Sequence, residues 1–293
     1  MDDTAYRPLL FSIAYGMTGS VGDAEDIVQD AFLGAARARR DGTTILDPKA
    51  YLTTTVTRLG MNHLRSARVR RETYVGNWLP EPVVVPADGT GPAEHAELAD
   101  SLSMAFLVLL ENLTPLERAV FMLHEVFGFA HAEVAGIVGK TEVNCRQIFA
   151  RSRARIAAHT RLPAGAARRS EGAELARRFF AAVTTGDLEA LLETLAPEVT
   201  SYGDGGGKAP ALATPLSGRD EVARFLIDLF RRTAARGVRV QPSWVNGRPG
   251  AVLRDRGGNV LSVLELHITG GRIQALHGVV NPDKLTHVGG QPS

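Results

Sequence analysis

The sequence predicts a multidomain chain in which two all-α domains precede an α+β domain. Apolar residues recur at helical spacing in residues 1–71 and 97–160, and a proline-rich linker at 72–96 separates these blocks. After a second linker at 161–170, residues 171–293 place amphipathic helices before strand-like runs, an order typical of an α+β domain. A chain of 293 residues is long enough to bury several such cores.

The composition of the chain limits the compartment in which it works and the kinds of partner that it can bind. No apolar run reaches the length of a membrane helix and no signal peptide opens the chain, so we expect a cytoplasmic protein without a membrane partner. The single cysteine, Cys145, excludes a disulfide framework and Cys-rich metal sites, and we expect no metal and no cofactor. The net charge of +1 conceals an acidic run at 23–30 and a basic run at 58–71, which indicate different partners for two neighbouring helices.

Helix-start signals locate two of the helices. Asp47 stands where an N-cap is expected, and Pro48 follows at the first helical position. Thr114, Pro115 and Glu117 have the spacing of a capping box with proline at the first position.

Residues 131–156 have the pattern of a helix-turn-helix. Ala135 is the small residue at the helix crossing, Gly139 occupies the turn, and Lys140 replaces an apolar residue that usually follows the turn. The inward positions are Val134, Val138, Cys145 and Ile148. The residue after the turn and the exposed face of the second helix, which starts near Thr141, then supply donors suited to base edges and phosphates: Lys140, Asn144, Arg146, Gln147, Arg151 and Arg153. The alternative is a solvated basic helix in an all-α bundle.

The basic run at 58–71 is open to two interpretations. A run of arginines is usually a solvated helix face. Asn62 and His63, interleaved with Arg65 and Arg68, instead favour a helix that reads bases beside phosphates.

Three segments, in this order, resemble the extracytoplasmic-function sigma factors of bacterial RNA polymerase: "GDAEDIVQDAFLGAAR", "YLTTTVTRLGMNHLRS" and the helix-turn-helix. The resemblance implies sigma region 2 at 1–71 and sigma region 4 at 97–160. It implies that the acidic helix binds the clamp coiled coil of the largest subunit of core RNA polymerase through Asp23, Glu25, Asp26, Gln29, Asp30 and Phe32. It further implies that Arg58, Asn62, His63, Arg65 and Arg68 bind the −10 element of promoter DNA and that the helix-turn-helix binds the −35 element. An acidic helix that is only a solvated surface remains the alternative.

Three shorter motifs, "NWLPEP", "DGGGK" and "NPDKL", resemble the subfamily whose sigma regions are fused to a SnoaL-like domain of the nuclear-transport-factor-2 type. The resemblance implies a curved sheet wrapped by helices into a cone, which modulates transcription initiation in cis. The residues implied in this interdomain regulation are Trp78, Leu79, Pro80, Glu81, Asp204, Gly205, Gly206, Gly207, Lys208, Asn281, Pro282, Asp283 and Lys284.

The glycine run at 203–207 does not form a phosphate-binding loop. Such a loop needs glycine where the chain has Tyr202, and serine or threonine where it has Ala209. We expect a flexible turn that leaves Asp204 and Lys208 available to contact the sigma regions or the linker.

Other functions stay open for the third domain and for the whole chain. Cones of this type can house catalysis or bind a small ligand. Glu265 and His267 share one strand face, either inside the cone or on its solvated outside, and exposure is the expectation. The other acid–base candidates are Tyr202, Asp204, Trp244 and His277. We expect a non-enzymatic sigma factor; the alternative is a stand-alone helix-turn-helix regulator with a ligand-sensing or catalytic third domain.

Overall fold

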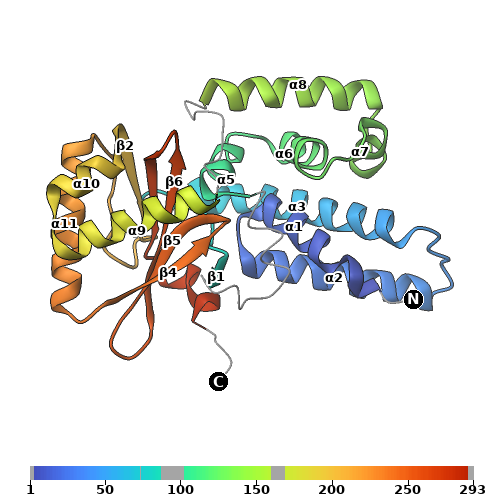
Figure 1. The fold of residues 1–293 in the computed structure, drawn as a ribbon. Helices are drawn as coiled ribbons and strands as arrows, with labels where there is room; N and C mark the ends of the chain where they lie inside the picture. The colour runs from blue at the N-terminus through green and yellow to red at the C-terminus, as the bar shows by residue number, and fades with distance from the viewer. Residues whose placement is uncertain (1–2, 73, 87–101, 160–168, 290–293) are drawn as a thin grey trace. The chain divides into compact units, whose positions relative to one another are not determined.

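The computed structural model describes residues 3–72, 74–86, 102–159 and 169–289, and the chain divides into two compact units (Figure 1). The first, called the helical unit, comprises Met1–Thr73 and Phe106–Arg161. The second, called the C-terminal unit, comprises Tyr74–Ala105 and Leu162–Ser293. The segment between the two helical blocks therefore belongs to the C-terminal unit. Parts of both predicted linkers, 87–101 and 160–168, lie outside the described residues, so the domain boundaries there stay predictions.

The helical unit is built from the two predicted all-α blocks. Its elements are η1 (Asp3–Tyr6), α1 (Arg7–Thr18), α2 (Val21–Arg40), α3 (Pro48–Glu72), α6 (Pro115–Phe121), the π-helical turn η2 (Met122–Val126), α7 (His131–Val138) and α8 (Glu142–His159), and α5 (Met104–Leu110) crosses the boundary between the units. None of the described helices is both long and apolar enough to cross a membrane.

Both predicted helix caps are confirmed. The Asp47 carboxylate accepts from the Ala50 amide at 2.9 Å, ahead of α3. At α6, the Thr114 hydroxyl accepts from the Glu117 amide at 3.3 Å and the Glu117 carboxylate accepts from the Thr114 amide at 2.9 Å. Each pair satisfies an amide that the first helical turn leaves without a partner.

Arg118 joins the two helical blocks inside the helical unit. Its side chain is buried, its Nε donates to the Gly16 carbonyl of α1 at 2.9 Å, and its Nη1 donates to Glu111 at 2.5 Å. A buried guanidinium is tolerated where such acceptors replace water.

The C-terminal unit is a mixed sheet with helices on one face. The helices are α9 (Arg169–Thr185), α10 (Leu188–Thr194) and α11 (Arg219–Ala235); the strands are β1 (Val84–Pro86), β2 (Leu195–Asp204), β3 (Leu216–Ser217), β4 (Arg239–Val245), β5 (Arg248–Arg254), β6 (Val260–Thr269) and β7 (Arg272–Val279); two 3₁₀ turns follow, η3 (Pro282–Lys284) and η4 (Thr286–Val288). The strand order is β1-β4-β5-β6-β7-β2-β3, and β2 pairs with β7 in parallel while the other neighbours are antiparallel. The predicted α+β class is confirmed, but the helices do not all come first, because β2 and β3 precede α11.

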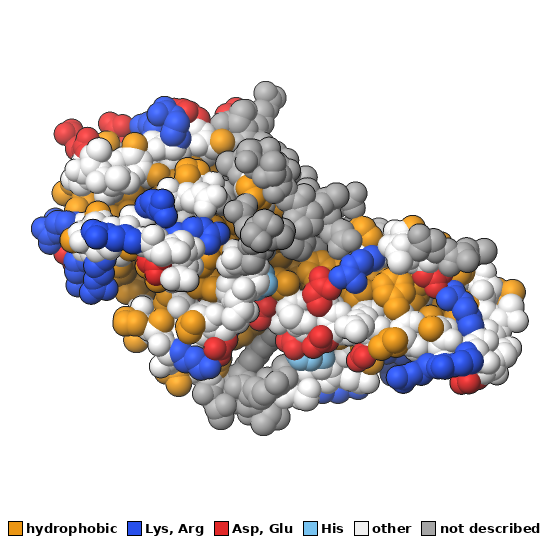
Figure 2. Space-filling view, turned by 90° about the horizontal axis from the view of Figure 1, so that it is seen from below, with side chains coloured by type: hydrophobic (Ala, Val, Ile, Leu, Met, Phe, Trp, Pro, Cys, Tyr) orange, Lys and Arg blue, Asp and Glu red, His pale blue; other side chains and the backbone are white. Residues whose placement is uncertain are grey.

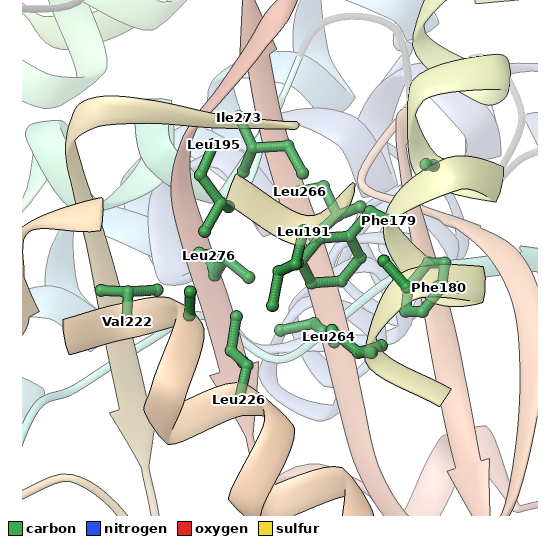
Figure 3. Close-up of a cluster of buried hydrophobic side chains, with 14 of the residues drawn as sticks. Phe179, Phe180, Leu191, Leu195, Val222, Leu226, Leu264, Leu266, Ile273 and Leu276 are labelled. Atoms are coloured by element: carbon green, nitrogen blue, oxygen red, sulfur yellow. The ribbon is translucent and has the colours of Figure 1, made fainter. Parts of the chain in front are cut away.

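Strand alternation divides the sheet residues between two faces. Leu264, Leu266 and Leu276 point toward Phe179 of α9 and Leu226 of α11, and together they form the core of the C-terminal unit (Figure 3). We call this the helix-covered face. The alternate residues of the same strands lie on the opposite face, because successive side chains of a strand point to opposite sides.

Candidate nucleic-acid interface and linker anchor

The helix-turn-helix forms as the sequence predicts. Gly139 ends α7 in the left-handed conformation, at φ +68°, and its amide donates to Ala135. The predicted inward side chains are buried, among them Cys145 at 0 % exposure and Ile148. Burial raises the pKa of the Cys145 thiol, which agrees with a packing role.

The outward face of α8 carries most of the predicted −35 readers. Lys140, Arg146, Gln147, Arg151 and Arg153 are exposed. Asn144 is half-buried, and its backbone amide donates to the hydroxyl oxygen of the N-cap residue Thr141 at 3.2 Å. Arg146 pairs with Glu142 one helical turn earlier at 2.5 Å while its side chain stays 61 % exposed. Such an exposed pair contributes little stability, so the Arg146 guanidinium can leave Glu142 for another acceptor at little cost.

The predicted −10 readers of α3 do not all face the same way. Arg58, Asn62 and Arg65 are exposed and follow one another at spacings of four and three residues, so they share a helix face. Arg65 donates to the Asn62 side chain at 2.9 Å. His63 is instead turned toward α2, where its Nε2 lies 3.3 Å from Asp23. Arg68 belongs to the end of α3 whose side chains lie outside the described residues.

Some carboxylates of the acidic helix α2 pair with neighbouring side chains, and others are exposed. Asp23 is held by His63, and Glu25 forms an ion pair with Arg7. Asp26, Gln29 and Asp30 are exposed, whereas Phe32 is half-buried.

Leu33 was missed by the sequence reasoning. Its side chain is 45 % exposed, and it follows Asp26, Gln29 and Asp30 at the i, i+3, i+4, i+7 spacing of one helix face. Figure 2 shows the side of the protein that carries α2, where acidic side chains lie beside apolar ones. Helix spacing alone could have identified this mixed acidic and apolar stripe.

A buried ion pair holds the linker within the C-terminal unit. Lys284 Nζ donates to Asp204 Oδ2 at 2.7 Å, and the two residues are 7 % and 0 % exposed. The same two side chains hold both backbone groups of Leu79: its amide donates to Asp204 Oδ2 at 2.8 Å, and its carbonyl accepts from Lys284 at 2.5 Å. We call Asp204, Lys284 and Leu79 the linker anchor.

Aromatic residues of the linker complete the surroundings of Lys284. Its Nζ lies 4.8 Å from the ring centroid of Tyr74 and 4.5 Å from that of Trp78, within the range of a cation–π interaction. The Tyr74 hydroxyl donates to Asp204 Oδ1 at 2.5 Å, and burial together with this carboxylate raises the tyrosine's pKa. The linker anchor thus has its charges neutralised and its acceptors occupied.

The glycine run packs against this anchor. Gly206 has φ +56°, and a Cβ there would lie 2.3 Å from Asn281 Nδ2 and 2.9 Å from the Tyr74 hydroxyl. Asp204 contacts the linker as expected, but it is buried at the end of β2 and does not lie in a flexible turn. Lys208 forms an exposed ion pair with Asp283. The glycines therefore permit close packing of the linker.

A second attachment lies at the other edge of the sheet. Linker strand β1 pairs antiparallel with β4, and the Val83 amide donates to Asn246 Oδ1 at 3.1 Å while the Asn246 amide donates to the Val83 carbonyl at 2.9 Å. His287 donates from Nε2 to the Pro82 carbonyl at 2.9 Å. Tyr74, Asn246 and His287 were missed by the sequence reasoning, although the Asn-Gly pair at 246–247 is a hairpin-turn signal.

Four of the acid–base candidates, Tyr202, Glu265, His267 and His277, lie on the sheet face opposite the helices. His277 Nδ1 is 2.5 Å from Glu265 Oε2, and Tyr202 stacks on His277 with ring centroids 5.2 Å apart. The expectation that Glu265 and His267 are exposed is wrong: they are 0 % and 5 % exposed. The His277 partner allows the Glu265 carboxylate to be buried.

The arrangement defines a class of protein. Residues 4–70 match the family Sigma-70 region 2, residues 103–156 match Sigma-70 region 4, and residues 176–280 match the SnoaL-like domain family. The chain belongs to the extracytoplasmic-function (ECF) sigma factors of RNA polymerase that carry a fused C-terminal SnoaL-like domain.

Particular relatives agree in sequence and in structure. The chain is 40 % identical to the ECF RNA polymerase sigma factor SigJ of Mycobacterium tuberculosis over 96 % of this chain and 91 % of that protein. It is 33 % identical to the probable ECF sigma factor SigI of the same organism, over 96 % and 92 %. The crystal structure of M. tuberculosis SigJ matches with a TM-score of 0.77 at 38 % identity, over 96 % of each chain. These relatives are named as sigma factors, not enzymes.

Removing the lysine of the linker anchor should destabilise the C-terminal unit. Lys284→Met leaves the Asp204 carboxylate buried without its cation, which costs about 3–5 kcal/mol. Both tryptophans, Trp78 and Trp244, belong to this unit, so urea unfolding followed by tryptophan fluorescence reports its stability. The control is Lys208→Met, which breaks an exposed pair and should cost at most about 1 kcal/mol. Equal losses in the two variants would contradict a structural role for the buried pair.

The burial of His267 should make the stability of the C-terminal unit depend on pH. Burial lowers the pKa of His267 below 6.5, with Glu265 opposing the shift and His277 and Arg248 adding to it. Below about pH 6.5, His267 binds a proton in the unfolded chain but stays neutral in the folded chain. The free energy of unfolding therefore falls as the pH drops. His267→Leu should reduce this slope by up to about one proton in the same fluorescence assay. An unchanged slope would show that His267 has the same pKa in the folded and unfolded chains and would contradict the lowered pKa.

Proposed function

We propose that the chain directs core RNA polymerase to two-element promoters through three separate helix faces. The outward stripe of α2 binds core polymerase, α3 binds the −10 element and α8 binds the −35 element. The observation that carries the proposal is the exposed basic and amide face of α8 behind a buried helix-turn-helix core. Acting with core polymerase, the chain works in the cytoplasm.

The α2 stripe suits a protein partner better than DNA. Asp26 and Asp30 repel phosphates, while Leu33 supplies apolar area that binding can remove from water. We assign this stripe to the clamp coiled coil of the largest polymerase subunit, with Gln29 as a further contact. Asp23 and Glu25 already bind His63 and Arg7, so they support the helix position and contribute less directly.

The DNA-reading faces divide into base and phosphate contacts. In α3, Asn62 and Arg65 offer amide and guanidinium groups, which are suited to base edges. Their mutual hydrogen bond holds the two side chains together on the exposed face that they share with Arg58. In α8, Arg146 and Gln147 lie in the first turns, where a recognition helix meets base edges, and Arg151 and Arg153 lie farther along, where phosphates are reached.

The SnoaL-like domain modulates initiation in cis by binding the linker. The segment that connects region 2 to region 4 along the chain is held by Asp204, Lys284 and Asn246, all residues of the C-terminal unit. Retention or release of this segment changes how much free chain connects the two DNA-reading regions. The motif residues Trp78–Glu81, the glycine run and Asn281–Lys284 serve this regulation.

Run-off transcription with purified bacterial core polymerase on a promoter library tests the function. The full chain should initiate at a shared two-element promoter. Forms truncated near Pro163 and near Val280 should change the yield, because the shorter one lacks strands β2–β7 and the longer one lacks Lys284 and His287. A form that gives no promoter-specific transcript but binds duplex DNA tightly without core polymerase would identify a stand-alone regulator instead.

Arg146→Ala tests base reading by α8. It should cost about 1–3 kcal/mol on the cognate −35 element and relax sequence preference, because a bidentate base contact is lost. Arg151→Ala should weaken cognate and scrambled elements alike and reduce the salt slope by about one. Arg177→Ala, an exposed and ion-paired arginine of α9, is the matched control and should leave both unchanged. Equal losses on cognate and scrambled sequences in Arg146→Ala would mark a phosphate contact only.

A further inference from the structure

The C-terminal unit contains a cavity at the end of its helix-covered face. Its volume is about 430 Å³, within the range of small-molecule sites. The second half of α11 forms one wall, strands β2, β6 and β7 form another, and the loop at 210–212 closes a side.

The lining is apolar with positive charge at one border. Phe225, Leu229, Phe230 and Leu264 are among the apolar side chains. The charged residues of the described lining are Arg232 and Arg236, and that lining includes no carboxylate and no imidazole. Glu265, His267 and His277 lie on the opposite face of the sheet. The cavity therefore offers binding without an acid–base pair for turnover.

The two arginines differ in whether they already form an ion pair. Arg232 forms an ion pair with Asp228 of the same helix. The Arg236 side chain is exposed and forms no hydrogen bond or ion pair with any described residue. A guanidinium beside an apolar cavity complements a ligand that has an apolar body and one carboxylate.

The cavity lining also contacts the linker. Asn77 Nδ2 donates to the carbonyl of Leu212 at 3.1 Å and approaches that of Gly203 at 3.4 Å, and both residues line the cavity. Asn77 directly precedes Trp78 and Leu79, and Gly203 directly precedes Asp204. A ligand that displaces the 210–212 loop would therefore move the Asn77 side chain, and with it the linker residues of the anchor.

We propose that the cavity binds a small apolar monocarboxylate and that Asn77 transmits its occupancy to the linker. The claim of ligand binding depends only on the C-terminal unit. The claim that the ligand regulates transcription rests on the proposed linker control of initiation. The carboxylate lies at Arg236 and the apolar body lies among the side chains of α11 and β6.

Isothermal titration of the full chain tests the binding site. Decanoate or naphthoate should bind, the first if the body is a flexible chain and the second if it is a rigid ring. The matching alcohol should bind about tenfold more weakly, and Arg236→Ala should reduce carboxylate affinity by about tenfold without affecting the alcohol. Arg231→Ala, on the same helix with an exposed ion pair and outside the lining, should change nothing. No binding of either acid, or equal binding of acid and alcohol, would overturn the site.

Fluorescence tests the transmission without polymerase. In a Trp244→Phe background, Trp78 reports the linker anchor, and the bound carboxylate should change its emission. Asn77→Ala should keep the affinity and lose the emission change; an unchanged emission in the parent, or a change that persists in Asn77→Ala, would overturn the transmission. Run-off transcription with and without the acid is scored separately. Binding with a Trp78 response but no promoter-specific transcript would refute the proposed function and leave the ligand site standing.

Discussion

The C-terminal unit depends on a buried ion pair that holds the backbone amide and carbonyl of one linker residue. Asp204 and Lys284 neutralise each other, and between them they satisfy both the amide and the carbonyl of Leu79. A buried charge with a missing partner is strongly destabilising, so each of these residues requires the other and both require the linker backbone. The linker is consequently part of the folded domain. Strand β1 extends the same dependence to the far edge of the sheet.

This anchor explains why a glycine run occurs here without a phosphate site. The linker backbone and Tyr74 approach the turn after β2 so closely that a Cβ at Gly206 would overlap Asn281. The glycines leave space for a neighbouring segment, as they would for a phosphate, but here the neighbour is protein. Local composition cannot distinguish these two uses, because both need a backbone without side chains.

The sequence predicted the features that depend on local chemistry. Thr114 with Glu117 and the Gly139 turn are set by residues a few positions apart, and periodicity indicates the helices of the first two blocks. Periodicity did not show that β2 and β3 precede α11. The burial of Glu265 and the turn of His63 toward Asp23 depend on partners far along the chain. Those partners become visible only when the strands are in register and the helices are packed, so exposure was the wrong expectation for Glu265.

The proposed regulation requires thermodynamic linkage between the cavity, the linker and the polymerase. A ligand can shift the linker only if it binds the anchored and the released states with different affinity. In the proposed regulation Asn77 supplies such a difference, because release of the linker would break its hydrogen bonds to Gly203 and Leu212. Linkage is reciprocal: if core polymerase and promoter DNA favour one linker state, they must change the affinity of the cavity by the same factor. A domain that holds the connection between two DNA-reading regions can therefore act as a regulator without contacting DNA itself.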